Sequence, residues 1–221
     1  MKTSNKLLFS FIGFVVLLMI ASDVILRANY NNGRFSDKAK DGDKKTWIEG
    51  LPPFKVLKVE GKESHTLTIS YGDSARIIFG NQNYKHYEYS RRDDTLFLKY
   101  EKDLDFRLLE CPDLSALVLV NTNVYLSEMK LDRLKIVAGN GAEVRVVNSN
   151  IDHLDMEVGN SATVEFSNNS AIDSLNLALG KHSALYMYDV PFRYTHLQLD
   201  SLRELSVTGS SLSSMKEMQS K

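Results

Sequence analysis

The middle of the chain repeats one pattern of residues, as LDRLKIVAGNGAEVRV (131–146), IDHLDMEVGNSATVEF (151–166) and IDSLNLALGKHSALYM (172–187). Each copy holds two short stretches in which apolar and polar residues alternate, which is typical of β-strands with one buried face. A glycine-containing turn separates the two stretches in every copy. Two short strands that recur with a period near 20 residues predict a solenoid of stacked coils.

Two series of apolar residues extend this pattern to five copies. We expect each series to form a column of inward side chains, because equivalent residues of neighbouring coils lie about 4.8 Å apart. The first expected column is Leu117, Leu134, Leu154, Leu175 and Leu197, and the second is Leu126, Val146, Phe166, Met187 and Val207. On the outer surface, the same register places Lys135 beside Asp155 and Arg145 beside Glu165, which are pairs of opposite charge.

The turns repeat with the same period as the strands. Gly139, Gly159 and Gly180 each lie before the second strand of a copy, and we expect them at positions with positive φ, where a Cβ atom would clash. An antiparallel sandwich of hairpins is the alternative fold, since strand centres about ten residues apart would also suit it. The same turn chemistry recurs every 20 residues rather than every 10, which favours a coil of two strands.

Strand patterns also precede the repeat. Alternating apolar segments bounded by Gly, Asn or Asp occur at 54–59, 65–71, 75–79 and 95–100. The sequence between 51 and 209 shows no long helical pattern. We therefore assign 51–209 to one all-β domain and 210–221 to a polar C-terminal tail.

The N-terminal part of the chain has a different composition. Residues 7–26 are almost free of charge, and a helix of that length would rise about 30 Å, enough to cross a bilayer. Lys2 and Lys6 form the positive flank of an export signal, and no clean cleavage site follows. We therefore predict a retained transmembrane signal-anchor within 1–26, followed by a polar linker at 27–50.

The composition excludes several classes of protein. The chain has 221 residues, with 27 Lys and Arg against 28 Asp and Glu and a net charge of -1, which argues against a nucleic-acid binder that neutralises many phosphates. A single cysteine excludes an intramolecular disulfide framework and a zinc site built on several thiolates. The sequence has no phosphate-binding glycine loop and no nucleophile elbow, and we predict no cofactor.

Several short motifs resemble one protein family. They are Gly72-Asp73, Asp93-Asp94-Thr95-Leu96, Cys111-Pro112-Asp113-Leu114, and the turns Gly139-Asn140-Gly141-Ala142 and Gly159-Asn160-Ser161-Ala162. Over residues 54–209 the chain resembles the head GIN domain family, which is named for auto-transporter adhesin heads in envelope proteins of Bacteroidetes-type bacteria. This resemblance implies a right-handed parallel β-helix outside the cytoplasm. The last coil departs from the family pattern at 201–204, as a terminal cap would.

The resemblance also bears on the orientation of the predicted span. Lys and Arg residues are more numerous after the span than before it, and this count alone favours a cytoplasmic domain. The resemblance implies the opposite, and we expect a single-pass protein of the bacterial inner membrane whose β-helix domain faces the periplasm. The expected partner is an envelope protein or polysaccharide, and the oligomeric state stays open.

Two sets of side chains are candidate binding residues. Six tyrosines could form an aromatic strip that binds a sugar or a peptide, namely Tyr84, Tyr87, Tyr89, Tyr125, Tyr186 and Tyr188. Of these, Tyr125 and Tyr186 face outward in the expected register and are the stronger candidates. Asp132, Asp152 and Asp173 form a column of carboxylates that could hold Ca²⁺ or could cap turns. Capping is favoured, because the glycine-rich nonapeptide with which β-roll repeats bind Ca²⁺ is absent from this sequence.

These observations predict a non-enzymatic module that binds, adheres or assembles in the cell envelope. A catalytic site usually interrupts a structural repeat, whereas the acidic residues here recur with it. Two alternatives stay open. One is a polysaccharide-processing enzyme on a β-helix scaffold, and the other is a regulatory or sensory subunit of a membrane complex.

Overall fold

The computed structural model describes residues 19, 47–61, 66–79, 87–100, 106–167 and 169–219. Residues 45–221 form one compact unit, and residues 1–44 form a second unit of which only Met19 is described. The predicted membrane segment at 7–26 and most of the predicted linker at 27–50 lie outside the described residues. Within the described part of the chain, no helix has the length and apolar character needed to span a bilayer.

Strands make up most of the described structure. They form where every second residue is apolar and buried while the residues between face water. The first strands are β1 (Trp47–Gly50), β2 (Val56–Glu60), β3 (Thr66–Tyr71), β4 (Arg76–Phe79), β5 (Tyr87–Arg92), β6 (Thr95–Tyr100) and β7 (Phe106–Cys111). The repeat follows as β8 (Ala116–Val120), β9 (Asn123–Ser127), β10 (Lys130–Ala138), β11 (Glu143–Val147), β12 (Asn150–Val158), β13 (Thr163–Ser167), β14 (Ala171–Leu179), β15 (Ser183–Tyr188), β16 (Phe192–Leu199) and β17 (Leu202–Thr208).

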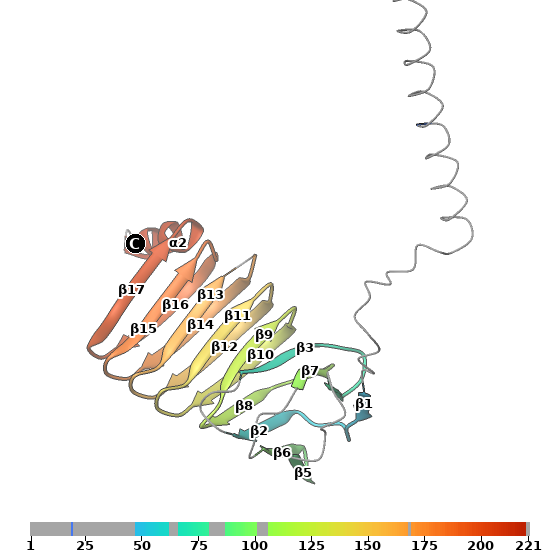
Figure 1. Cartoon of the computed structure of the whole chain (residues 1–221). Coiled ribbons are helices and arrows are strands. Elements are labelled where there is room, and N and C mark those ends of the chain that lie inside the picture. The colour runs from blue at the N-terminus through green and yellow to red at the C-terminus, as the bar shows by residue number, and fades with distance from the viewer. Residues whose placement is uncertain are drawn as a thin grey trace, which may run out of the picture. The chain divides into compact units, whose positions relative to one another are not determined.

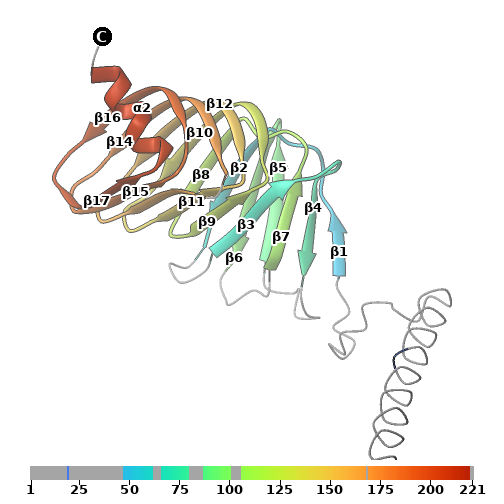
Figure 2. The same ribbon diagram turned by 90° about the horizontal axis from the view of Figure 1, so that it is seen from above.

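The strands form two sheets that face each other across the core (Figure 1). Sheet A runs β1-β4-β7-β3-β9-β11-β13-β15-β17, and sheet B runs β5-β6-β2-β8-β10-β12-β14-β16. From β8 onward the chain alternates between the sheets, so that successive coils stack side by side, as Figure 2 shows from above. Neighbouring strands in this part are parallel. The domain is therefore an all-β solenoid of about five turns, and the hairpin alternative is wrong for the repeat.

One of the two predicted core columns is confirmed along its whole length. Leu126, Val146, Phe166, Met187 and Val207 are register partners across sheet A. The column continues beyond the repeat through Ile69 on β3 and Leu109 on β7. All of these side chains except that of Val207, in the last coil, are buried.

The other predicted column is confirmed only in its middle. Leu134, Leu154 and Leu175 are register partners. At the two ends the prediction is wrong by two residues, because Leu117 pairs with Ile136 and Leu197 pairs with Leu177. A slip of two residues leaves the same face of a strand pointing inward, so the alternation of apolar residues does not reveal it.

The N-terminal strands depart from a simple stack. β2 and β3 form a coil between the β6–β7 coil and the β8–β9 coil, although they precede both in the sequence. β4 pairs with β1 and β7 in antiparallel orientation, and β5 pairs with β6 in the same way. The expectation of a parallel β-helix over the whole of 51–209 is therefore wrong at this end.

The predicted reason for the turn glycines is also wrong. Gly139, Gly159 and Gly180 do not have positive φ. Positive φ angles occur two positions later, at Gly141, Ser161 and His182. Each left-handed residue lies within the turn from sheet B into sheet A, two positions after the glycine that opens the turn.

A ladder of asparagine side chains explains why glycine is needed. Asn160 N donates to Asn140 Oδ1 at 2.9 Å, and Lys181 N donates to Asn160 Oδ1 at 2.8 Å. A Cβ atom on Gly159 would lie 2.5 Å from Asn140 Oδ1, and a Cβ atom on Gly180 would lie 2.5 Å from Asn160 Oδ1. Gly159 and Gly180 therefore leave room for the preceding turn and its asparagine, whereas a Cβ atom on Gly139 would have its nearest neighbour, Leu119 O, at 3.7 Å.

The opposite corner of the solenoid carries the C-terminal helix, α2 (Ser210–Gln219). Gly209 turns the chain out of β17 with a φ of 61°. Ser210 N then donates to Asp189 Oδ1 at 2.9 Å, and Val190 N donates to Ser211 Oγ at 2.8 Å. These bonds fix the start of α2 to the preceding coil.

Two segments predicted to be a linker and a tail contain secondary structure. The polar tail predicted at 210–221 carries α2, and the linker predicted at 27–50 ends in β1. The departure from the repeat at 201–204 coincides with a register shift in β17 opposite Ser183 and Ala184. The irregular sequence there therefore marks a local change of pairing in the last coil.

Candidate binding face

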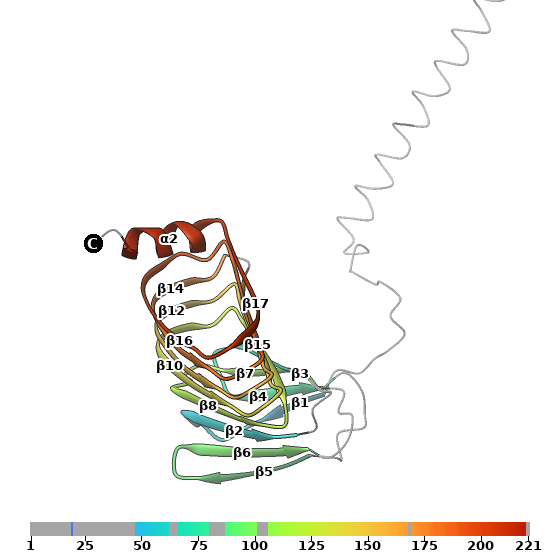
Figure 3. The same ribbon diagram turned by 90° about the vertical axis from the view of Figure 1, so that its left-hand side faces the viewer.

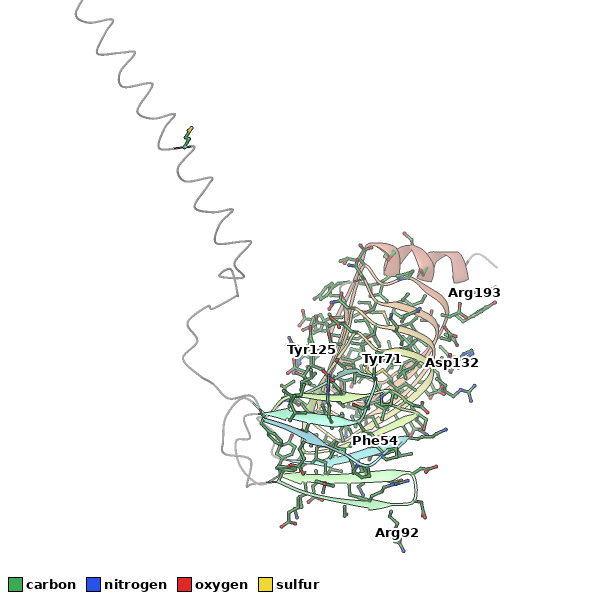
Figure 4. All side chains as sticks on the ribbon, turned by 90° about the vertical axis from the view of Figure 1, so that its right-hand side faces the viewer. Phe54, Tyr71, Arg92, Tyr125, Asp132 and Arg193 are labelled. Atoms are coloured by element: carbon green, nitrogen blue, oxygen red, sulfur yellow. The ribbon has the colours of Figure 1, made fainter. Side chains whose placement is uncertain are left out.

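The outer surface of sheet A carries a column of polar and aromatic side chains. Tyr125, Arg145, Glu165 and Tyr186 are register partners on β9, β11, β13 and β15. They alternate with the inward apolar residues of these strands and therefore face away from the core. Figure 4 shows Tyr125 on this side of the solenoid. Both tyrosines predicted as binding residues thus belong to one outward column, with a charged pair between them.

The charged pair has a defined geometry. Arg145 Nε donates to Glu143 Oε1 at 2.6 Å and lies 3.6 Å from Glu165 Oε2. The hydrogen bond to Glu143 raises the pKa of the Arg145 guanidinium, and the charges of Glu143 and Glu165 raise it further. Because Arg145 is largely open to solvent, these contacts contribute little stability. They do place the guanidinium beside the carboxylates of Glu143 and Glu165.

The aromatic end of the column contains two tyrosines. The rings of Tyr186 and Tyr188 stack with centroids 5.9 Å apart and planes at 26°. The Tyr186 hydroxyl donates to Glu204 Oε2 at 2.7 Å, and this hydrogen bond raises the pKa of the tyrosine. We call the set Tyr125, Arg145, Glu165, Tyr186 and Tyr188 the sheet A face.

Glu204 was not singled out from the sequence, whereas Tyr188 belongs to the predicted aromatic strip. Tyr188 lies two positions after Tyr186, and strand alternation places both on one face, so the sequence carried a signal for it. Glu204 reaches Tyr186 from the last coil, where the register shifts. The last coil lacks the glycine-containing turn that aligns the earlier coils with one another. The spacing of residues therefore did not indicate that Glu204 lies beside Tyr186.

The aspartate column lies on sheet B. The register pairs that flank Asp132, Asp152 and Asp173 place them on successive strands, and Figure 4 shows Asp132 and Arg193 on the side away from Tyr125. Asp173 Oδ1 lies 3.8 Å from Arg193 Nη1, and a groove of about 600 Å³ runs along Asp152, Asp173 and Arg193. Among the residues that the structure describes, no group of three His, Cys, Asp or Glu is arranged to hold a metal ion.

The cysteine has no nucleophilic environment. Cys111 lies at the end of β7 and is buried in the core. Burial, with a smaller contribution from the charge of Asp113, raises the pKa of its thiol to about 12. The thiol is therefore protonated at neutral pH and acts as a small apolar side chain.

Comparison with known proteins gives only distant likenesses. No family model and no curated protein matches the chain. A structure named a "putative adhesin" from Bacteroides fragilis NCTC 9343 has 11% identity and a TM-score of 0.41, covering 73% of this chain and 94% of that one. A structure of the same description from Parabacteroides distasonis ATCC 8503 has 12% identity and a TM-score of 0.37, covering 75% and 98%.

A third structure, named a "putative lipid binding protein", also comes from Parabacteroides distasonis ATCC 8503. It has 9% identity and a TM-score of 0.41, covering 77% of this chain and 96% of that one. These likenesses are too weak to define the family or the ligand of this chain.

Proposed function

We propose that the protein is a non-enzymatic binding module of the bacterial cell envelope. In this proposal, residues 7–26 anchor the chain in the inner membrane, and residues 27–46 tether a right-handed solenoid of the head GIN type in the periplasm. The solenoid acts by contact with an envelope polysaccharide that lies across the sheet A face.

The outward column of sheet A is the observation that supports this proposal. Tyrosine rings offer flat apolar surfaces for sugar rings, and the charged pair between the tyrosines offers hydrogen-bond donors and acceptors. The column follows the stacking direction of the coils, and solenoids use such extended surfaces for extended partners. On sheet B the acidic residues repeat along the coils and one of them pairs with Arg193, so that surface offers a weaker case for binding.

Cosedimentation with peptidoglycan sacculi tests the binding step. The full-length protein in detergent should sediment with the sacculi, and the double variant Tyr186→Ala, Tyr188→Ala should bind at least fivefold more weakly. Tyr194→Ala is the matched control, because Tyr194 is an exposed tyrosine on the opposite sheet, and it should bind like the parent. Equal binding by all three proteins, or no binding by the parent, would contradict the proposal.

Protease treatment of cells tests the proposed compartment. The domain should resist digestion in intact cells and be cleaved once the outer membrane is opened by osmotic shock. If cleavage also requires rupture of the inner membrane, the periplasmic placement is wrong.

A further inference from the structure

The C-terminal end of the solenoid leaves part of the core open. Leu185 on β15 is fully buried, whereas its register partner Leu205 on β17 is 52% exposed. Leu197 and Leu199 on β16 are only partly buried, although their partners one coil earlier are buried. Figure 3 looks onto this end and shows α2 at one corner of the last coil rather than across it. The apolar side chains between β16 and β17 are therefore partly exposed at this end of the solenoid.

Both strands of this end are sheet edges. Among the described strands, β17 ends sheet A and β16 ends sheet B. Such edges expose backbone donors and acceptors that can pair with a further strand. A ligand that paired with both edge strands would need two strands of its own, as far apart as β16 and β17. It would also need apolar side chains between those two strands. One extended peptide would pair with only one of the two sheets.

The N-terminal end does not match this surface. Its edge in sheet B is β5, which pairs antiparallel to β6 and exposes Glu88, Arg91 and Arg92. Charged edge strands are a common means of preventing further pairing. Head-to-tail stacking would place this charged edge in contact with the apolar C-terminal end of the next copy, which is unfavourable.

We propose that the C-terminal end binds the same end of a second copy of this chain. A two-fold axis perpendicular to both sheets would set each β17 antiparallel to its counterpart and each β16 likewise, so that both sheets continue across the interface. The last coil carries two basic residues, Arg193 and Arg203, and two acidic residues, Asp200 and Glu204. Its net charge is therefore zero, and two such ends do not repel each other through net charge. Such an interface uses one surface twice and closes as a dimer.

The size of this end sets the strength of the contact. The seven residues of β17 span about 23 Å at a rise of about 3.3 Å per residue. Two sheets about 10 Å apart, with their outer side chains, are about 20 Å wide. Two such ends would bury about 900 Å², which lies below the standard range for stable interfaces. The dimer is therefore weak, and its formation depends on protein concentration.

Sedimentation of the full-length protein in density-matched detergent over a concentration series tests this inference. The parent should convert from monomer to dimer, and Leu205→Lys should raise the dissociation constant at least tenfold. Ile48→Lys is the matched control, because Ile48 is an exposed apolar residue on β1, the edge of sheet A at the other end. It should dimerise like the parent.

Three results would overturn the inference. They are a parent that stays monomeric, a Leu205→Lys protein that still dimerises, and growth beyond the dimer. If Leu205→Lys fails to fold, Leu205→Cys provides a second measurement. Under mild oxidation it should form a covalent dimer while Ile48→Cys stays monomeric, and equal cross-linking of the two variants would contradict the proposed interface.

Discussion

At the scale of single residues, the turn at Gly159 makes a sharp prediction. Gly159→Ala should destabilise the domain by about 1–3 kcal/mol, the usual cost of forcing extra atoms into a packed site. The added Cβ atom would lie 2.5 Å from Asn140 Oδ1 and 2.8 Å from Asn140 N. Urea unfolding followed by circular dichroism measures the change.

Gly139→Ala is the matched control for this prediction. Gly139 occupies the same repeat position one coil earlier, but a Cβ atom there would have its nearest neighbour, Leu119 O, at 3.7 Å. Gly139→Ala should therefore change the stability by less than about 1 kcal/mol. If both variants lose the same stability, the asparagine ladder is not what requires glycine.

The turn glycines also show what sequence reasoning can and cannot supply. Their recurrence every 20 residues correctly located the turns. Glycine is selected both by positive φ and by close packing, and a sequence does not distinguish these two causes. The close approach of Asn140 Oδ1 and of the backbone of Gly139 and Asn140 identifies close packing as the cause at Gly159.

At the scale of elements, the inward positions differ between the interior of the stack and its end. Leu185→Ala should destabilise the domain by about 2–5 kcal/mol, because it opens a cavity in a sealed core. Its register partner Leu205 already has half of its surface in water, so Leu205→Ala should cost about 1 kcal/mol or less. Thermal unfolding at low protein concentration compares the two, and equal losses would show that the last coil is as closed as the coil before it.

The attachment of α2 predicts a dependence on pH. The N–H of Ser210 lowers the pKa of Asp189 by hydrogen bonding to its carboxylate. A carboxyl group whose pKa is lowered by folding stabilises the fold above its ordinary pKa, near 3.9, and this contribution disappears as the pH falls through the folded pKa.

The comparison that measures this effect is the parent against Asp189→Asn, which keeps an acceptor but carries no charge. The parent should be the more stable protein at pH 6, and the difference in urea midpoint should shrink as the pH falls through the lowered pKa of Asp189. A difference that stays constant with pH would show that the charge of Asp189 does not hold α2.

Strand positions were predictable because burial on one face imposes alternation on the sequence. The same alternation fixed the outward column from Tyr125 to Tyr186, since the positions between inward residues must face out. The register of Leu117 and Leu197 was not predictable, because a shift of two residues preserves the face. The lengths of the turns decide such shifts. The turns from β8 to β9 and from β16 to β17 are shorter than the turns from β10 to β11 and from β12 to β13.

At the scale of the whole molecule, the order of coils follows the sequence only from β8 onward. The β2–β3 coil enters between two later coils, and β1, β4 and β5 add antiparallel edges. Apart from the β5–β6 hairpin, these pairings join segments far apart in the chain, so no local period in the sequence records them. The repeat could be predicted from the sequence because each of its coils contacts the coil that follows it in the chain.

The central claim is that successive coils stack in parallel, with Arg145 beside Glu165. Disulfide formation in the double variant Arg145→Cys, Glu165→Cys tests it most directly, because neighbouring Cα atoms about 4.8 Å apart can be bridged. The buried thiol of Cys111 should not compete. The control Lys135→Cys, Glu165→Cys places its cysteines on the outer surfaces of different sheets. The stacked solenoid predicts rapid intramolecular bridging in the first variant and none in the control, whereas no bridging in the first, or equal bridging in both, would contradict it.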